Sequence, residues 1–257
     1  MRIMALNQSP MRPGIDRNRV EAQLRAYASP GTVIDLVYPD DFPGAAIFEQ
    51  LGDQENALSG LHHALETPSL IRKTVWAQEN GYDAVIQTNT FDPGVEAARM
   101  AVSIPVIGLL RSSLHVASIV AHRIGIMVPL DGHVARTREL LRMYGMESSV
   151  CGMRVLRRYG KSLESQREDL TAESVRVMRE LVTEDGAEVI LPLGAALIPK
   201  VVDPRTLEPQ VGVPVLNTRW IGVRTAEMCV DLGMSQSPVA YPLAKVGSEA
   251  YDQLAFG

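Results

Sequence analysis

Small polar residues follow several short apolar runs of the chain, where they could bind an anion or a carbonyl oxygen. Three runs lead into Asn7-Gln8-Ser9, Thr88-Asn89-Thr90 and Arg111-Ser112-Ser113. Two more lead into Gly194-Ala195 and Asn217-Thr218-Arg219. Hydroxyl, amide and guanidinium groups beside exposed backbone N–H groups suit a carboxylate or a cyclic amide. The same residue types cap helices and form turns, but five clusters at corresponding places favour a binding site.

The chain also repeats one strand–helix pattern. AVIQTN followed by the segment Ile104–Arg123 parallels EVILPLG followed by the segment Val213–Leu232, and Pro105 then corresponds to Pro214. A duplicated strand–helix unit predicts two similar α/β lobes with a ligand between the strand ends. A purely structural duplication is the alternative.

Short apolar runs alternate with amphipathic stretches, which is typical of an α/β fold. The runs lack strict alternation, as in parallel strands that are covered on both faces. We predict two pseudo-twofold related lobes, each a mostly parallel four-stranded sheet flanked by helices. Residues 1–110 would form the first lobe, completed by the C-terminal helix within 220–257, and residues 111–219 the second. The predicted strands are Arg2–Leu6, Val33–Val37, Ala84–Gln87, Val106–Leu109, Gly125–Val128, Met153–Leu156, Val189–Leu193 and Val215–Asn217. The predicted helices include Arg17–Tyr27, Ser69–Asn80, Val95–Val102, Ser113–His122, Gly132–Tyr144, Thr171–Glu184 and Gly222–Leu232.

Composition limits the classes of function. The 257 residues are 46% hydrophobic and 21% charged, with a net charge of −5, which is ordinary for a globular protein. Basic runs typical of nucleic-acid binding are absent from the sequence, as are apolar stretches long enough to span a bilayer and the histidine and cysteine spacing of a zinc site. Two cysteines do not make a disulfide framework. We expect a cytoplasmic homo-oligomer without metal or cofactor.

The order of the segments resembles the aspartate/glutamate/hydantoin racemase superfamily, and most of all its hydantoin and allantoin racemase branch. MRIMALNQS resembles the opening strand, and GYDAVIQTNTFDPGVEAARMAVSIPVIGL resembles the first catalytic segment, with Asp92-Pro93-Gly94 intact. GAEVILPLG, GVPVLN and RTAEMCVDLGMSQS resemble the second segment and the closing helix. The resemblance covers nearly the whole chain and implies the two-lobed fold of that family.

The chain departs from this family at its reactive residues. The resemblance implies two cysteines, one in each lobe, that remove and return an α-proton, since the pKa of a thiol can be tuned near neutrality. The first position carries Asn89 here, and the second carries Ala195, or Gly194 by a different count. None of these side chains can accept a proton from carbon. Cys151 and Cys229 are predicted to be structural, so the two-thiol mechanism is not available.

Three functions remain open. The first is cofactor-independent, isomerase-like chemistry at a carbon next to a carboxyl or amide carbonyl. The second is a lyase or decarboxylase, because carbon–carbon cleavage needs an anion hole more than a base. The third is a small-ligand-binding protein without catalysis. The candidate catalytic residues are Asn89, Thr90, His63 and Lys200, with His62 and Tyr38 as further candidates for moving the proton.

Two arginines indicate the charge of the substrate. Arg111 and Arg219 each follow a Pro-led strand, and the hydantoin branch generally has an acidic residue where Arg111 stands. Guanidinium groups would favour a small carboxylate over a neutral hydantoin, unless both point to solvent. The irregular segment Tyr38–Glu66 is either a lid over the site or a solvated connection.

Overall fold

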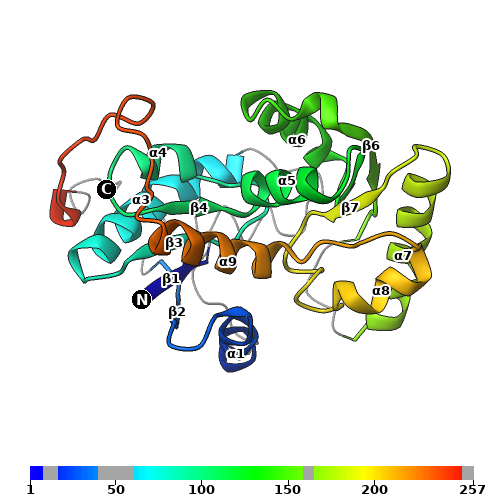
Figure 1. Ribbon diagram of the computed structural model, residues 1–257, viewed down its shortest axis with the longest axis horizontal. Coiled ribbons are helices and arrows are strands. Elements are labelled where there is room, and N and C mark those ends of the chain that lie inside the picture. Colours follow the sequence, from blue (N-terminus) through cyan, green and yellow to red (C-terminus); the bar gives the residue numbers. More distant parts are fainter. Residues whose placement is uncertain (8–16, 40–60, 159–164, 251–257) are drawn as a thin grey trace. The chain divides into compact units, whose positions relative to one another are not determined.

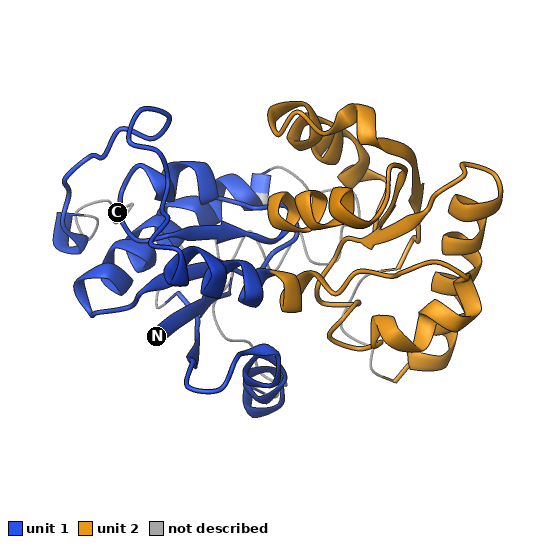
Figure 2. Cartoon of the chain, in the orientation of Figure 1, with its two compact units in different colours: residues 1–48, 61–109, 222–257 blue, residues 49–60, 110–221 orange. Residues whose placement is uncertain are grey.

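The computed structural model describes residues 1–7, 17–39, 61–158 and 165–250 (Figure 1). Gln8, Ser9 and residues 40–60 of the proposed lid therefore lie outside the described residues. The chain divides into two compact units (Figure 2). Unit 1 comprises residues 1–48, 61–109 and 222–257, and unit 2 comprises residues 49–60 and 110–221.

Unit 1 is built on a four-stranded sheet in the order β2-β1-β3-β4, with every neighbouring pair parallel. Parallel neighbours require crossover connections, and the helices of this unit supply them. The strands are β1 (Arg2–Leu6), β2 (Val33–Val37), β3 (Ala84–Gln87) and β4 (Val106–Gly108). The helices are α1 (Arg17–Tyr27), α3 (Leu61–Glu79), α4 (Val95–Arg99) and the part of α9 (Thr218–Asp231) that begins at Gly222.

Helices cover both faces of this sheet, which is why its strands are apolar on both sides. Successive side chains of a strand point to opposite faces. Val85 packs in one cluster with Leu70 and Ala77 of α3. Ile86 points the other way and lies against Gly222 of α9. The buried strands thus hold their carboxyl ends at fixed positions.

Unit 2 is built on a three-stranded parallel sheet in the order β6-β5-β7. Its strands are β5 (Ile124–Val128), β6 (Val150–Val155) and β7 (Val189–Pro192). Its helices are α5 (Leu109–Val120), α6 (Gly132–Met143), the 3₁₀ turn η2 (Glu147–Ser149), α7 (Arg167–Thr183), α8 (Pro204–Val211) and the first turn of α9.

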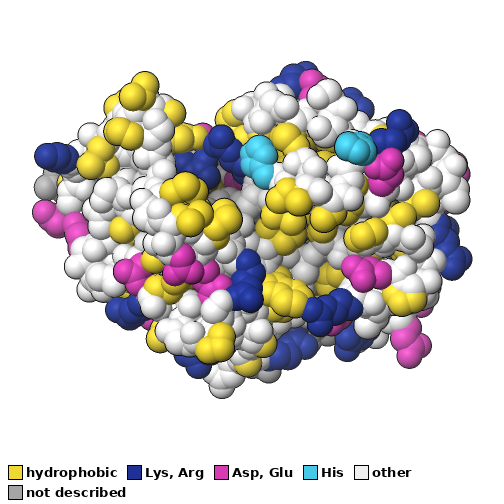
Figure 3. Space-filling model, viewed as in Figure 1, with side chains coloured by type: hydrophobic (Ala, Val, Ile, Leu, Met, Phe, Trp, Pro, Cys, Tyr) yellow, Lys and Arg dark blue, Asp and Glu magenta, His cyan; other side chains and the backbone are white. Residues whose placement is uncertain are grey.

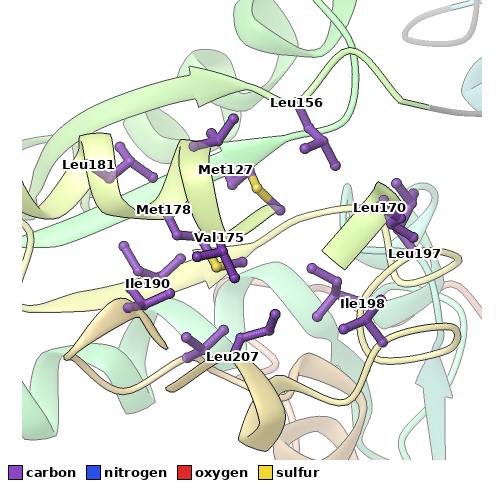
Figure 4. Close-up of a cluster of buried hydrophobic side chains, with 14 of the residues drawn as sticks. Met127, Leu156, Leu170, Val175, Met178, Leu181, Ile190, Leu197, Ile198 and Leu207 are labelled. Carbon is purple, nitrogen blue, oxygen red and sulfur yellow. The ribbon is translucent and has the colours of Figure 1, made fainter. Parts of the chain in front are cut away.

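The core of unit 2 lies beneath α7 (Figure 4). Val175 and Met178 of α7 pack with Met127 of β5 and Ile190 of β7, and Leu207 brings α8 into the same cluster. Burying a side chain of this size contributes about 1.5–3 kcal/mol. This core fixes the carboxyl ends of β5 and β7.

The α/β class with parallel, helix-flanked sheets is confirmed, but the predicted fourth strand of the second sheet is reduced. Val215 forms only an isolated parallel bridge with Ile190. Pro214 has no N–H to extend the ladder, and α9 begins at Thr218. The segment therefore makes two backbone hydrogen bonds with Ile190 and then turns into the helix.

Four helices begin earlier than predicted, namely α3, α5, α7 and α9, and two of these starts move arginines of the predicted site. Gly108 ends β4 and Leu109 begins α5 with no loop between them. Arg111 therefore lies in the first turn of α5, and Arg219 lies in the first turn of α9. The predicted strand-end positions of both arginines are corrected to helix N-terminal turns.

Surface charge is mixed on the face shown in Figure 3, where basic and acidic side chains are interspersed. No helix in the described part of the chain combines the length and the apolar character that crossing a membrane demands.

Candidate active site

The carboxyl ends of β1 and β3 are the candidate binding place of unit 1. The chain passes from β1 to β2 on one side and returns to β3 on the other, and ligands of open α/β sheets bind where the strand order reverses in this way. Asn7 follows β1 and Thr88 follows β3. Thr88 Oγ1 lies 3.2 Å from Asn7 Oδ1 and 3.1 Å from the carbonyl oxygen of Leu6. The predicted pair Asn7 and Thr88 is thus brought together.

Asn89 follows in a turn that its own side chain stabilises. Its backbone N–H donates to Gln87 Oε1 at 2.5 Å, and its Oδ1 accepts from the Phe91 N–H at 2.9 Å. Its Nδ2 lies 3.4 Å from Nε2 of His63. Asn89 is half-buried, whereas Thr88 and Thr90 on either side are buried. Of the three residues, Asn89 is therefore the one most accessible to a ligand.

His63 reaches this turn from α3. Its side chain is 6% exposed, and its ring centroid lies 5.8 Å from that of Phe91. Glu66, one turn further along α3, is fully buried. A neutral imidazole can accept a proton, which an amide cannot. The structure thus places His63, one of the proton-transfer candidates that the sequence identified in unit 1, against Asn89.

Asp92 holds the far end of the turn. Its φ is 47°, which is uncommon for a residue other than glycine, and its side chain is 4% exposed. A Cβ added to Gly108 would lie 2.5 Å from the Asp92 carboxyl carbon. Glycine is therefore the residue type that leaves room for this carboxylate at position 108, directly before the first residue of α5.

Unit 2 has the same reversal of strand order, between β5 and β7. Gly194 follows β7 with a φ of 87°, and a Cβ there would lie 2.5 Å from Cγ of Pro129, which follows β5. A side chain at position 194 would be strained and would clash. Ala195, which is 5% exposed, is therefore the better of the two predicted counterparts of the second cysteine.

The polar residues at the start of α9 serve in part to cap the helix. Asn217 Oδ1 accepts from the N–H of Trp220 at 3.0 Å, which is the ordinary role of asparagine at a helix N-cap. Thr218 is fully buried, and Arg219 is 7% exposed. The Arg205 guanidinium lies 4.4 Å from the Trp220 ring. For Asn217 the structure thus shows helix capping.

The remaining predicted residues of unit 2 lie on α5 and in the segment before α8. Arg111 is half-buried, with its guanidinium carbon 5.3 Å from the centroid of the Tyr144 ring. Ser112 is half-buried and Ser113 is fully buried. Lys200 is half-buried directly after Pro199. Of these, Ser113 is the least accessible to a ligand.

Neither cysteine lies at the carboxyl end of a strand. Cys151 is the second residue of β6, and its Sγ lies 3.4 Å from the carbonyl oxygen of Ile124. Cys229 lies near the end of α9. Burial raises the pKa of both thiols, which disfavours the reactive thiolate. Both features support a structural role.

The sequence prediction missed two buried ionisable residues, one on a helix of each unit. Glu66 entered the sequence prediction only as the end of a loop. His133 belongs to the first turn of α6, directly after β5, and is 3% exposed. Burial would have identified both residues, but sequence spacing does not reveal it. No group of three or more His, Cys, Asp or Glu side chains suited to a metal occurs among the residues with described positions.

These sheets define a doubly wound α/β protein with polar residues where the strand order reverses. Residues 18–226 match the protein family described as Asp/Glu/Hydantoin racemase. The chain belongs to this family, as the resemblance of its motifs implied.

Individual relatives agree with this assignment. A hydantoin racemase of Pseudomonas sp. (strain NS671) is 34% identical over 177 residues, which are 67% of this chain and 68% of that protein. The allantoin racemase structure from Pseudomonas fluorescens superposes with a TM-score of 0.82 at 23% identity, covering 96% of this chain and 98% of that one. An arylmalonate decarboxylase structure gives a TM-score of 0.56 at 17% identity, covering 93% and 96%.

The chain is thus an enzyme of the racemase type, in a fold that also includes a decarboxylase. This result favours catalysis over the simple binding protein that the sequence left open.

Proposed function

We propose that the protein is an isomerase that moves a proton at a carbon next to a carbonyl group of a small carboxylate or cyclic amide, without using a cysteine and without a cofactor. The observation that carries this proposal is the contact of Asn89 with His63 at the carboxyl end of β3. By family resemblance, a thiol would stand at position 89. The chain has an amide there and an imidazole beside it.

The chemistry requires a base and a group that stabilises negative charge. Removing the α-proton leaves an enolate-like anion, whose oxygen must be held by hydrogen-bond donors. His63 Nε2 is the proposed base in unit 1. Asn89 Nδ2 has a second hydrogen that it can donate to the oxygen of the anion. Thr90 follows the same strand as Asn89, and Asn7 follows β1. In unit 2, Lys200 is the proposed second proton-transfer residue.

The substrate belongs to one of two classes that proton exchange can separate. The relatives are named for hydantoin and allantoin, which are cyclic amides. Arg111 and Arg219 instead favour a carboxylate by charge-assisted pairing. A panel of hydantoins and α-substituted carboxylates incubated in heavy water tests both, with ¹H NMR following loss of the α-proton signal.

The proposal predicts enzyme-dependent exchange for at least one member of the panel. His63→Gln should reduce this exchange at least tenfold, since general bases contribute on the order of 10²–10⁴-fold. His115→Gln is the matched control, because His115 is exposed on α5. A folded His63→Gln variant with normal exchange would exclude His63 as the base.

A lyase on the same scaffold is the alternative. Loss of carbon dioxide from a malonate leaves the same kind of anion and needs donors for its oxygen more than it needs a base. The amide at position 89 favours this alternative, because it can donate but cannot take a proton. Release of carbon dioxide from arylmalonates, together with no α-proton exchange in the hydantoins and carboxylates of the panel, would support this alternative.

A further inference from the structure

The side-chain amide of Asn89 can adopt only one orientation. Its Oδ1 accepts a hydrogen bond of 2.9 Å from the backbone N–H of Phe91. Rotating the amide by half a turn would place its NH₂ against that N–H, so two donors would face each other. The amide nitrogen must therefore be the atom that faces His63 Nε2, at 3.4 Å.

This orientation determines where the hydrogen of His63 lies. An amide nitrogen only donates, so Nε2 of His63 must be the acceptor. A neutral imidazole carries its single hydrogen on the other nitrogen when one accepts, so His63 is the Nδ1–H tautomer. A proton on Nε2 would put two donors face to face and cost the hydrogen bond with Asn89.

We propose that Asn89, besides donating to the substrate anion, positions His63 and keeps it neutral, with the Nε2 lone pair turned toward position 89. The inference rests on the proposed function, in which the α-proton moves to Nε2 and the C–H electron pair remains on the substrate as an enolate. Because Nε2 has one lone pair, the incoming proton takes the place of the Asn89 hydrogen, and the imidazolium that forms loses its hydrogen bond with Asn89. Return of the proton to carbon restores that bond, so the same contact favours both the base before the reaction and the acid after it.

Two buried carboxyl groups on the same elements would act in the opposite direction in their ionised form. Glu66 lies on α3 with His63, and Asp92 lies in the β3–α4 turn with Asn89; both side chains are buried. An ionised carboxylate near an imidazole favours its protonated form, whereas a hydrogen bond donated to Nε2 favours the neutral form. Asn89 faces Nε2 of His63 directly, so changing it separates its effect from that of the two carboxyl groups.

The wild-type protein provides the first test, without substrate or variant. Selective ¹⁵N labelling of histidine and long-range ¹H–¹⁵N NMR distinguish the two tautomers, and His63→Gln assigns the signal. We expect His63 to be the Nδ1–H tautomer at pH 7. An Nε2–H tautomer or a doubly protonated ring would overturn the inference.

Asn89→Asp provides the second test, because a carboxylate has the same shape but can only accept. The ring should then carry a hydrogen on Nε2, and the midpoint of its titration should rise by about one pH unit or more. The acidic limb of the exchange rate should move by a similar amount. Asn80→Asp is the matched control, because Asn80 is exposed and donates to the carbonyl oxygen of Trp76. An unchanged tautomer and titration in a folded Asn89→Asp variant would contradict the inference.

The two proposals can fail separately. If the spectrum shows the Nδ1–H tautomer but no member of the panel exchanges its α-proton, the proposed function fails and the role of Asn89 in selecting the tautomer stands. If exchange depends on His63 but the ring is the Nε2–H tautomer, the function stands and Asn89 does not position the base.

Discussion

The thiols of this chain lie away from the carboxyl ends of its strands. Cys151 is near the amino end of β6, and Cys229 is near the carboxyl end of α9. Burial raises the pKa of both thiols. We expect the double variant with both cysteines changed to serine to retain α-proton exchange within a few-fold. The exchange rate of the folded double variant is the measurement, and loss of exchange would show that a thiol takes part.

Gly108 is the residue whose small size the turn at Asn89 requires. A Cβ there would lie 2.5 Å from the Asp92 carboxyl group, so Gly108→Ala should destabilise the protein by about 1–3 kcal/mol through overpacking. Exchange should also slow, since the Asp92 N–H donates to the Asn89 carbonyl. Urea unfolding and exchange rates provide the two readouts.

Gly81→Ala separates overpacking from backbone strain. Gly81 has a φ of 73° and open space around its Cβ position, so its replacement should cost about 1 kcal/mol from strain alone and leave exchange unchanged. If Gly108→Ala behaves in the same way as Gly81→Ala, the contact with Asp92 does not position the turn.

Arg111 and Arg219 provide the test of substrate charge. Replacing the arginine that pairs with a substrate carboxylate by alanine should raise the KM at least tenfold, because a charge-assisted hydrogen bond contributes about 1.5–3 kcal/mol. Arg205→Ala is the control, since Arg205 stacks on Trp220. Normal KM values for a carboxylate in both the Arg111→Ala and Arg219→Ala variants would remove the argument for an anionic substrate.

At the scale of single elements, apolar runs predict the strands of unit 1 well, whereas four of the seven predicted helices begin earlier than expected. Arg2–Leu6, Val33–Val37 and Ala84–Gln87 are strands with the predicted bounds, because buried parallel strands need continuous apolar sequence. Helix α5 follows β4 without a loop, so no turn residue marks its first residue. The early start of α5 changes the position of Arg111 from a strand end to a helix turn.

Helix α8 was missed although its sequence contains start and stop signals. Asp203 caps it by accepting from the Arg205 N–H, Pro204 is its first residue, and Gly212 ends it with a φ of 87°. These are the favoured residue types at the two ends of a helix. The eight-residue length gives too few turns for a periodic pattern to stand out.

The sequence predicts which residues of the candidate site follow the strands, but not which of its side chains contact one another. Asn7, Thr88 and Asn89 follow from the positions of β1 and β3. The contact of Asn89 with His63 joins residues 26 positions apart on two elements, and it depends on how α3 packs on the turn. The close approach of Pro129 to Gly194 is likewise a tertiary contact without a sequence signal.

Glu227 anchors α9 to the loop before β2 and should make that attachment pH-dependent. Burial would raise the pKa of Glu227, but hydrogen bonds from the Ser29 backbone and from Arg224 outweigh it and hold the pKa below its ordinary value. The Ser29 N–H donates at 2.7 Å. A lowered folded-state pKa contributes stability that is present above the unfolded-state value and is lost as the pH falls through the folded-state pKa.

Glu227→Gln should therefore destabilise the protein by about 1–3 kcal/mol at pH 7, and the difference from wild type should shrink below about pH 4. Urea unfolding at several pH values measures this. Glu139→Gln is the control, since its pair with Arg136 is exposed and should contribute little. A difference that stays constant down to pH 3 would show that the charge of Glu227 does not matter.

At the scale of the whole molecule, the course of the chain makes unit 1 depend on the last residues described. Unit 1 takes its strands from the first 109 residues and then receives residues 222–257 after unit 2 has been traversed. Tyr241 donates to Glu96 at 2.7 Å, and the Ala244 N–H donates to the Met100 carbonyl at 2.7 Å. The segment after Asp231 thus makes hydrogen bonds with α4 and with Met100, which directly follows α4.

Gln236 is the residue of this segment whose loss should affect unit 1 alone. Its Nε2 donates to the carbonyl oxygens of Val102 and Ile104, at 2.6 and 2.9 Å. Gln236→Ala leaves both carbonyls without this donor and should cost about 1–3 kcal/mol. Hydrogen exchange should then accelerate at the amides of β3 and β4 and stay unchanged in β5 and β7.

The control for this prediction is Gln210→Ala in α8. Its Nε2 donates to the carbonyl oxygen of Thr206 at 2.9 Å within one exposed helical turn, so water can replace the bond and exchange should change little in either unit. If Gln236→Ala accelerates exchange equally in both sheets, the two units unfold together. Acceleration confined to β3 and β4 would mean that unit 1 opens independently, and that its stability depends on residues beyond Asp231 that lie far from its strands in sequence.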